Sequence, residues 1–128
     1  MQEIISSDLD LIVQAILNAQ VKSQWKFGKA YPHLMKRIRL GHLSDDATIE
    51  TYEAIVHQVL TNPTANVYVY IYASLIYPTV TDIIENKLWL VIIGIDSILE
   101  KALPPESPNN YLSNKAFVFL GSLEDLVI

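Results

Sequence analysis

A short basic segment in the first third of the sequence carries the residue types best suited to chemistry. Its lysine, arginine and histidine side chains lie within residues 29–42 and are Lys29, His33, Lys36, Arg37, Arg39 and His42. His33 comes three residues before Lys36 and four before Arg37, so these three side chains can share one face of a helix. A histidine there can move a proton while the cations hold a phosphate and stabilise its charge. The spacing indicates a phosphate site, and the alternative is a solvated helix whose cations balance an acidic surface.

Two further groups of residues could contact a nucleic acid. Tyr68, Tyr70 and Tyr72 alternate along the sequence, so on a strand they would share one face and could stack on bases. The alternative is a face of packing tyrosines, because tyrosine suits strands. Glu100 and Lys101 form a charge pair inside another strand-like segment. Such a pair ordinarily marks the exposed face of a strand.

Several classes of site are excluded by the residues present. The chain has no cysteine, which rules out disulfides, thiolate metal ligands and cysteine nucleophiles. Its four glycines are isolated from one another, so there is no glycine-rich phosphate loop, and no Gly-x-Ser-x-Gly motif occurs. The histidines His33, His42 and His57 lack the spacing of metal ligands. We therefore expect neither a metal ion nor a small-molecule cofactor.

Composition and charge indicate one globular domain with an acidic body. The chain has 128 residues, of which 51% are apolar and 18% charged, as is usual for a single domain. Its formal charge of −5 does not favour nucleic acid overall, so such a site has to be a local basic patch. We expect no signal peptide at Met1–Ser7 and no membrane span at Leu88–Ile95, the longest apolar run. We expect a soluble protein of the cytoplasm.

Helical patterns dominate the first half of the chain. Apolar residues recur at helical spacing over residues 8–24, where Asp8 can cap the first turn. A shorter helix is predicted from Tyr31-Pro32 to Gly41, since proline fits a first turn. The clearest helix is predicted over residues 45–61, with capping oxygens from Ser44, Asp45 and Asp46.

A strand-like pattern replaces the helical one after Asn62-Pro63. Strands are predicted over residues 67–72, 75–84, 88–93, 98–103 and 117–120. Pro78 favours an edge or a bulge for the second strand, while the apolar run Leu88–Ile93 favours a strand buried on both faces. Residues 105–115 are predicted to be a polar loop, and residues 122–126 a short helical tail.

The order of these elements predicts an α+β fold. N-terminal helices would pack on one face of an antiparallel sheet of about four strands. The other face would be partly open, and a functional site would lie there. Because we find no repeat and no linker, residues 1–128 are predicted to form a single domain.

The layout of short motifs resembles a family of small ribonucleases. A helix with the sequence Tyr31-Pro32-His33-Leu34-Met35-Lys36-Arg37 runs into Leu40-Gly41-His42-Leu43. An amphipathic helix over residues 44–60 follows, and then a meander whose third strand is Leu88–Ile93. The fourth strand ends in Ala102-Leu103-Pro104-Pro105, and Tyr111-Leu112 comes after it. This order is similar to that of the barnase–EndoU–colicin D/RelE-like class, in particular its colicin D-like and phage-associated members.

The resemblance implies that residues 28–126 form a ribonuclease-like core and residues 1–27 a helical addition. It further implies RNA cleavage without a metal, in which a ribose 2′-hydroxyl attacks the adjacent phosphate. His33 would match the family's helix histidine, and Lys36 and Arg37 would contact phosphate. Glu100 would stand where relatives carry serine or threonine, with Lys101 next to it. Lys29, Arg39, His42, Tyr68 and Tyr70 are the expected further contacts with RNA.

Departures from the family pattern keep a second hypothesis open. Ala30 and Pro32 replace lysines that the family often has, and Glu100 places a negative charge in the expected site. The alternative is a non-catalytic interaction domain that binds a protein partner or forms a homodimer, with an apolar patch at Tyr68, Tyr70, Trp89 and Phe117. An acidic immunity- or antitoxin-like protein is a third reading. The discriminating observation is whether His33, Lys36 and Arg37 share a cleft with Glu100 or Lys101.

Overall fold

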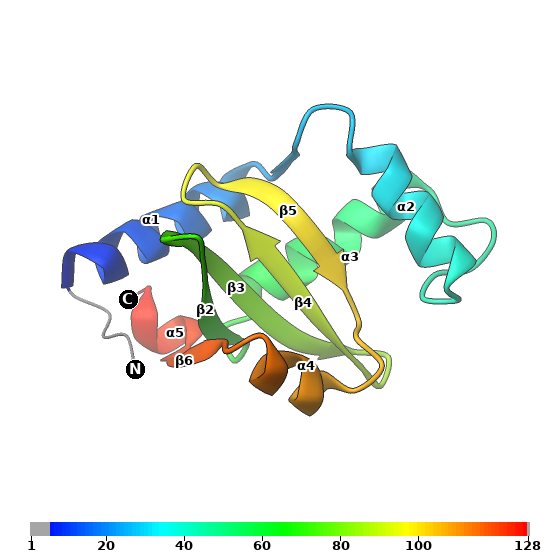
Figure 1. Ribbon diagram of the computed structural model, residues 1–128. Helices are drawn as coiled ribbons and strands as arrows, with labels where there is room; N and C mark the ends of the chain where they lie inside the picture. Colours follow the sequence, from blue (N-terminus) through cyan, green and yellow to red (C-terminus); the bar gives the residue numbers. More distant parts are fainter. Residues whose placement is uncertain (1–5, 128) are drawn as a thin grey trace.

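A six-stranded sheet with helices against one face forms the body of the molecule, as the computed structural model shows for residues 6–127 (Figure 1). Its strands lie in the order β1-β5-β4-β3-β2-β6. In chain order the elements are α1 (Ser6–Val21), β1 (Gln24–Trp25), α2 (Ala30–Arg39), α3 (Ile49–Thr61), β2 (Asn66–Tyr72), β3 (Leu75–Ile84), β4 (Lys87–Ile93), β5 (Ile98–Leu103), α4 (Pro108–Asn114), β6 (Val118–Ser122) and α5 (Leu123–Leu126). The expectation for Met1–Ser7 falls largely on residues outside this description.

The predicted α+β class is confirmed, while the sheet is larger than expected. Strands β2 to β5 form the predicted antiparallel meander. Two strands flank it: β6 pairs antiparallel with β2, and β1 pairs parallel with β5. The sheet is therefore mixed and has six strands rather than about four. The two-residue strand β1 falls where the first helix was predicted to continue, because α1 already ends at Val21.

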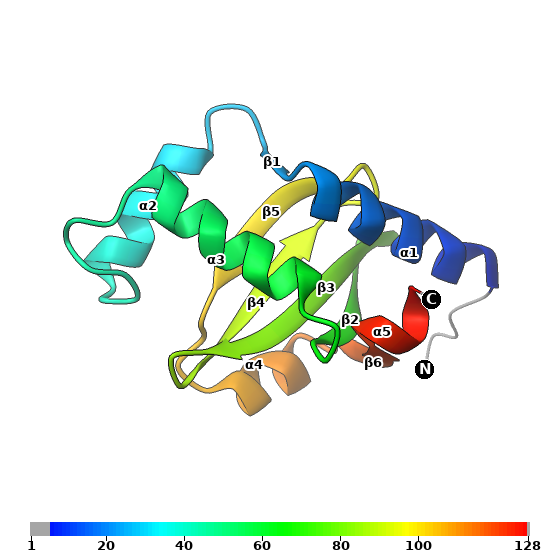
Figure 2. The ribbon, with the colours of Figure 1, turned by 180° about the vertical axis from the view of Figure 1, so that it is seen from behind.

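Helices α1 and α3 cross one face of the sheet and bury the main core (Figure 2). The apolar stripe of α1 contributes Ile12 and Ile16, and that of α3 contributes Val56 and Val59, all with no exposed surface. Burial of such side chains is worth about 1.5–3 kcal/mol each. Helix α2 lies beside β5 and contacts both β5 and α3 (Figure 1), which places the basic segment next to the edge of the sheet.

The second face of the sheet is less open than expected. Alternation along β3 and β4 directs Thr79, Thr81, Leu90 and Ile92 away from the helix-side core, yet all four are buried. The prediction that Leu88–Ile93 is buried on both faces is confirmed for Trp89 onward. Only part of this face is left for a site, and that part lies beyond the central strands.

Three local predictions are corrected by the structure. Helix α3 begins at Ile49, because Thr48 and Thr51 form a reciprocal capping box; Ser44, Asp45 and Asp46 precede it. Residues 108–114, predicted to be loop, form helix α4 with Pro108 in its first turn. Strand β3 is interior rather than an edge, but its pairing with β4 starts only at Thr79. Pro78 therefore lies where β3 has a single neighbour, β2, and a missing N–H is tolerated there.

Candidate anion-binding site

A small recess brings four of the predicted site residues together. His33, Lys36 and Arg37 come from α2, and Lys101 comes from β5. The recess has a volume of about 80 Å³ and is completed by Ala102 and Leu103. This is space for two or three water molecules, which suits a small anionic group rather than a whole nucleoside. We call these four side chains the basic recess.

The end of α2 fixes the position of Arg37. Gly41 has φ +76°, a left-handed conformation in which glycine is favoured. The chain turns back there, so that the His42 N–H donates to Arg37 O at 2.8 Å and the Gly41 N–H donates to Ile38 O at 2.9 Å. This Schellman motif brings the His42 ring over the helix, where Nδ1 lies 3.1 Å from Arg37 Nη1. Because an arginine can only donate, the His42 Nδ1 atom is the acceptor.

Arg37 is a buried cation without a carboxylate. Its exposed fraction is 5%, and the Nε atom has no hydrogen-bond acceptor among the residues that the structure describes. Burial lowers its pKa, against attraction from the Tyr52 and Tyr111 hydroxyls. A buried charge that no partner neutralises is expensive, and an anion held in the recess would offset that cost. Arg37 is thus the strongest sign of a binding site in the molecule.

His33 is held in a ring stack at the rim of the recess. Its imidazole stacks on Trp25 at a centroid distance of 5.2 Å, and Trp25 in turn lies 5.0 Å from the Tyr52 ring. Burial is the main cause that lowers the pKa of His33, and repulsion from Arg37, Lys101, Lys36 and Lys29 adds to it. With a pKa below 6.5, the ring is neutral at pH 7 and can accept a proton.

Lys101 reaches the recess from a β-bulge. In β5, Lys101 pairs with Ile92 and Leu99 with Ile93, so Glu100 is an extra residue on this strand. Leu99 and Ala102 both point into the core, and the bulge leaves Glu100 and Lys101 on the other face together. Partial burial lowers the pKa of Lys101, as does repulsion from Lys115, Lys36 and Arg37, while Glu100 acts in the opposite sense.

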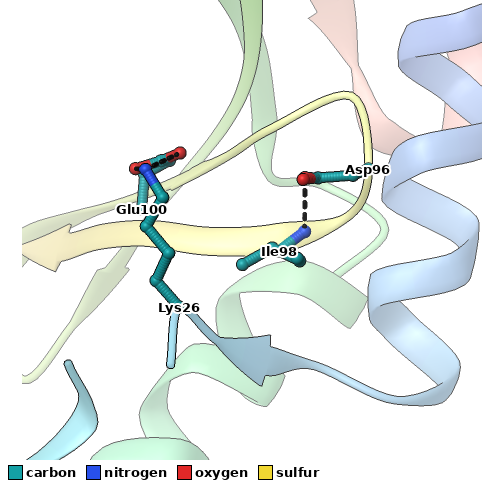
Figure 3. A network of polar contacts seen from close by, with 4 residues as sticks. All are labelled: Lys26, Asp96, Ile98 and Glu100. Atoms are coloured by element: carbon teal, nitrogen blue, oxygen red, sulfur yellow. Dashed lines mark hydrogen bonds and ion pairs between the residues drawn. The ribbon is translucent and has the colours of Figure 1, made fainter. Parts of the chain in front are cut away.

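Glu100 lies beside the recess without lining it. Its carboxylate accepts hydrogen bonds from Lys26 Nζ, and the contacts to both oxygens measure 3.1 Å (Figure 3). The turn before β5 is fixed by Asp96, whose Oδ1 accepts from the Ile98 N–H at 3.1 Å (Figure 3). Among the described residues, Lys26–Glu100 is the one carboxylate–cation salt bridge. The negative charge at position 100 is therefore paired with Lys26, although it also attracts the neighbouring Lys101.

A larger cavity adjoins the basic recess at Lys101. It has a volume of about 250 Å³ and an aromatic wall, and its lining residues are Tyr70, Tyr72, Tyr77, Ile92, Glu100, Lys101, Tyr111, Lys115 and Phe117. We call it the aromatic cavity. Tyr77, Tyr111 and Lys115 are not among the predicted site residues, and Phe117 is predicted only as part of the apolar patch of the interaction-domain hypothesis. Tyr111 and Lys115 have helical i, i+4 spacing, but the sequence around them predicts a loop.

The remaining predicted residues lie away from both cavities. Tyr68 packs edge-on against Phe117 and Phe119, so it does not share the position of Tyr70. Lys29 at the start of α2 and Arg39 near its end are exposed and line neither cavity. His42 contacts the recess only through Arg37.

Three members of the predicted apolar patch gather on one face of the sheet, because Phe117 packs against both Tyr68 and Tyr70, while the fourth lies elsewhere. Trp89 is 2% exposed and belongs to the helix-side core, on the opposite side of the sheet from Tyr70.

Within residues 6–127, no three His, Asp or Glu side chains are arranged to hold a metal ion. In the same part of the chain, no helix is both long and apolar enough to span a bilayer. The chain matches no protein-family model, no curated protein and no solved structure.

Proposed function

We propose that the protein binds single-stranded RNA at the basic recess and cleaves it without a metal ion. The observation that carries this proposal is the convergence of His33 with Lys36, Arg37 and Lys101 around one small space. None of the residues lining that space is a carboxylate, and Arg37 is buried without one. Such a site favours a phosphate group over any neutral ligand.

In the proposed reaction, two residues of the recess transfer protons and two stabilise the charge on the phosphate. The neutral His33 ring takes the proton from a ribose 2′-hydroxyl, and the 2′-oxygen attacks the adjacent phosphorus. The bond from phosphorus to the 5′-oxygen then breaks, and this oxygen takes a proton from Lys101, whose lowered pKa makes it a better acid. Lys36 and Arg37 stabilise the charge that builds on the phosphate oxygens. The products are a 2′,3′-cyclic phosphate and a free 5′-hydroxyl.

This proposal keeps the resemblance to colicin D-like nucleases as a hypothesis. A toxin or phage-related role, action on RNA in the cytoplasm and control by a protein inhibitor would all follow from it. The support is the match between the predicted residues His33, Lys36, Arg37 and Lys101 and the cluster that the fold brings together.

Cleavage of labelled single-stranded RNA and tRNA in the presence of EDTA tests the proposal. We expect cleavage by the wild-type chain and a loss of about 100-fold or more in His33→Gln, the scale of a missing general base. His57→Gln is the matched control, because His57 is exposed on α3 and lines neither cavity. If the wild-type chain at high concentration cleaves no faster than His33→Gln, the catalytic proposal is wrong.

A non-catalytic interaction domain is the second candidate, and one surface favours it. Phe27 is fully exposed beside Gly28, and Tyr31 and Val21 are 64% and 89% exposed. Phe27 and Tyr31 line one hollow at the loop between β1 and α2, while Val21 lies at the end of α1. Large apolar groups gathered at a surface are typical of protein contacts. If the wild-type chain does not cleave RNA, this second candidate is favoured, with a protein partner or a second copy of the chain bound at that loop.

A further inference from the structure

We propose that the aromatic cavity is a nucleobase site, which receives the base of a nucleotide whose phosphate lies in the basic recess. This inference rests on the proposed function and extends it to the part of RNA that is recognised. The juxtaposition that carries it is Lys101, which lines both spaces. A ligand that fills both must therefore present an anionic group next to a planar apolar group.

The size of the cavity suits a single base. Its volume of about 250 Å³ lies below the roughly 300–1,000 Å³ of sites for drug-sized ligands. A whole dinucleotide cofactor would exceed it, whereas one ring system fits. The basic recess, at about 80 Å³, is too small for a base and can hold only the phosphate.

The wall of the cavity has the chemistry of a stacking platform. Tyr70 stacks on Phe117 with ring centroids 4.9 Å apart, and on Tyr72 with the two planes within 14° of parallel. The ring centroids of Tyr111 and Phe117 are 5.9 Å apart, and the Lys115 Nζ atom lies over the Tyr111 ring. Aromatic platforms bind bases with little regard to sequence, because every base has a π-face.

Charge favours a nucleotide over a neutral aromatic compound. Lys101 and Lys115 both line the cavity and have no carboxylate partner within residues 6–127. The one carboxylate in the lining, Glu100, is paired with Lys26. The cavity is therefore apolar on its wall and positive at its rim, as a nucleotide requires.

Binding of two oligomers of equal charge tests the base site. One is a five-nucleotide oligothymidylate, which lacks the 2′-hydroxyl and cannot be cleaved, and the other is the same deoxyribose-phosphate chain without bases. We expect the wild-type protein to bind the oligothymidylate about tenfold more tightly, within the range for one base stacked on aromatic side chains. Tyr72→Ala and Tyr111→Ala should each reduce this preference, and Lys101→Gln should weaken the binding of both oligomers.

The controls separate failure of this inference from failure of the proposed function. Tyr31→Ala removes an exposed tyrosine outside the cavity and should leave the preference unchanged. Tyr72 is 55% exposed at the end of β2, so its replacement should fold even if that of Tyr111 does not. Equal binding of the two oligomers, or a preference that survives both tyrosine changes, would overturn the base site alone. No binding of either oligomer would overturn the proposed function as well.

Discussion

At the scale of single residues, the site depends on charges that are left without opposite partners. Arg37 is buried with its Nη1 on His42 and its Nε without an acceptor among the described residues. Lys101 is flanked mainly by other cations. The buried charge of Arg37 raises the free energy of the folded chain, so its retention is understandable if an anion binds beside it. Burial lowers the pKa of His33, and repulsion from the charges of Arg37 and Lys101 lowers it further.

Removal of one cation should change the pKa of one histidine and not of the other. Lys101→Gln removes a repulsive charge from His33, so we expect the His33 pKa to move up toward 6.5. Lys87→Gln should instead raise the pKa of His42, since Lys87 and not Lys101 is among the charges that lower it. Titration of the two imidazole Cε1 protons by NMR measures both.

This titration also fixes the pH dependence of cleavage. Because the His33 pKa is below 6.5, cleavage should rise through an acidic limb below that pH and be level at pH 7. In Lys101→Gln the rate of cleavage should fall, because the proposed proton donor is lost, and the acidic limb of the remaining cleavage should move to higher pH. Equal shifts of both histidines in either variant would show that the effect is a general change of charge and would contradict the local assignment.

At the scale of elements, β5 connects the two parts of the site to the core. Its bulge turns Glu100 and Lys101 to the same face, while Leu99 and Ala102 stay in the core. The Tyr52 hydroxyl of α3 donates to Ala102 O at 2.5 Å. Burial raises the pKa of Tyr52 to about 12, so this hydroxyl stays protonated as a donor. Helix α3 therefore holds the strand directly beneath Lys101.

Tyr52→Phe should destabilise the fold by about 1 kcal/mol. The ring and its contact with Trp25 remain, but the buried hydrogen bond to Ala102 is lost, and one such bond is worth about 0.5–1.5 kcal/mol. Urea unfolding followed by circular dichroism measures the change. Tyr31→Phe is the control and should stay within about 0.5 kcal/mol, because its side chain is exposed. An equal loss in both variants would show that the Ala102 bond contributes nothing to stability.

The elements also show what the sequence could and could not predict. β3 and β5 have the predicted bounds, because alternation and turn residues define a meander locally. The two-residue strand β1 was missed since it exists only through pairing with β5, and no pattern of two residues signals that. Helix α4 was missed because three turn-forming residues open it, and the cap of α3 was misplaced because Ser44, Asp45 and Asp46 are equally good capping residues.

Part of the candidate site could likewise be predicted from the sequence, and part could not. The cluster of His33, Lys36 and Arg37 follows from helical spacing and was predicted. The aromatic cavity joins β2, β3, β4, β5, α4 and the residue before β6, segments that only the folded sheet brings together. Tyr77 could not have been assigned to it from its neighbours in sequence, and Phe117 is grouped with Tyr70 only in the expected apolar patch. The exclusion of Tyr68 depends on its packing against Phe119, which is equally a result of strand pairing.

At the scale of the whole molecule, an acidic protein carries a small cationic site. The formal charge is −5, with nine lysines and arginines against fourteen carboxylates. Four of the nine line the two cavities: Lys36 and Arg37 come from α2, Lys101 comes from β5, and Lys115 follows α4. At physiological salt, charges more than about 8 Å away are largely screened. At low salt the net negative charge of the protein would thus repel RNA, and the cations of the site would attract it only at short range.

The salt dependence of oligomer binding should accordingly show that the protein contacts very few phosphates. Each phosphate neutralised on a single strand contributes roughly −0.7 to the slope of log K against log salt, so the phosphate held in the basic recess should give a slope of about −0.7. Lys101→Gln should bring the slope closer to zero, because it removes one of the cations that neutralise this phosphate. Lys22→Gln, at an exposed residue just after the end of α1, should leave the slope unchanged. Fluorescence anisotropy of the labelled oligothymidylate in a potassium chloride series measures these slopes. A slope near zero, or one that both substitutions change equally, would mean that binding does not pass through the basic recess.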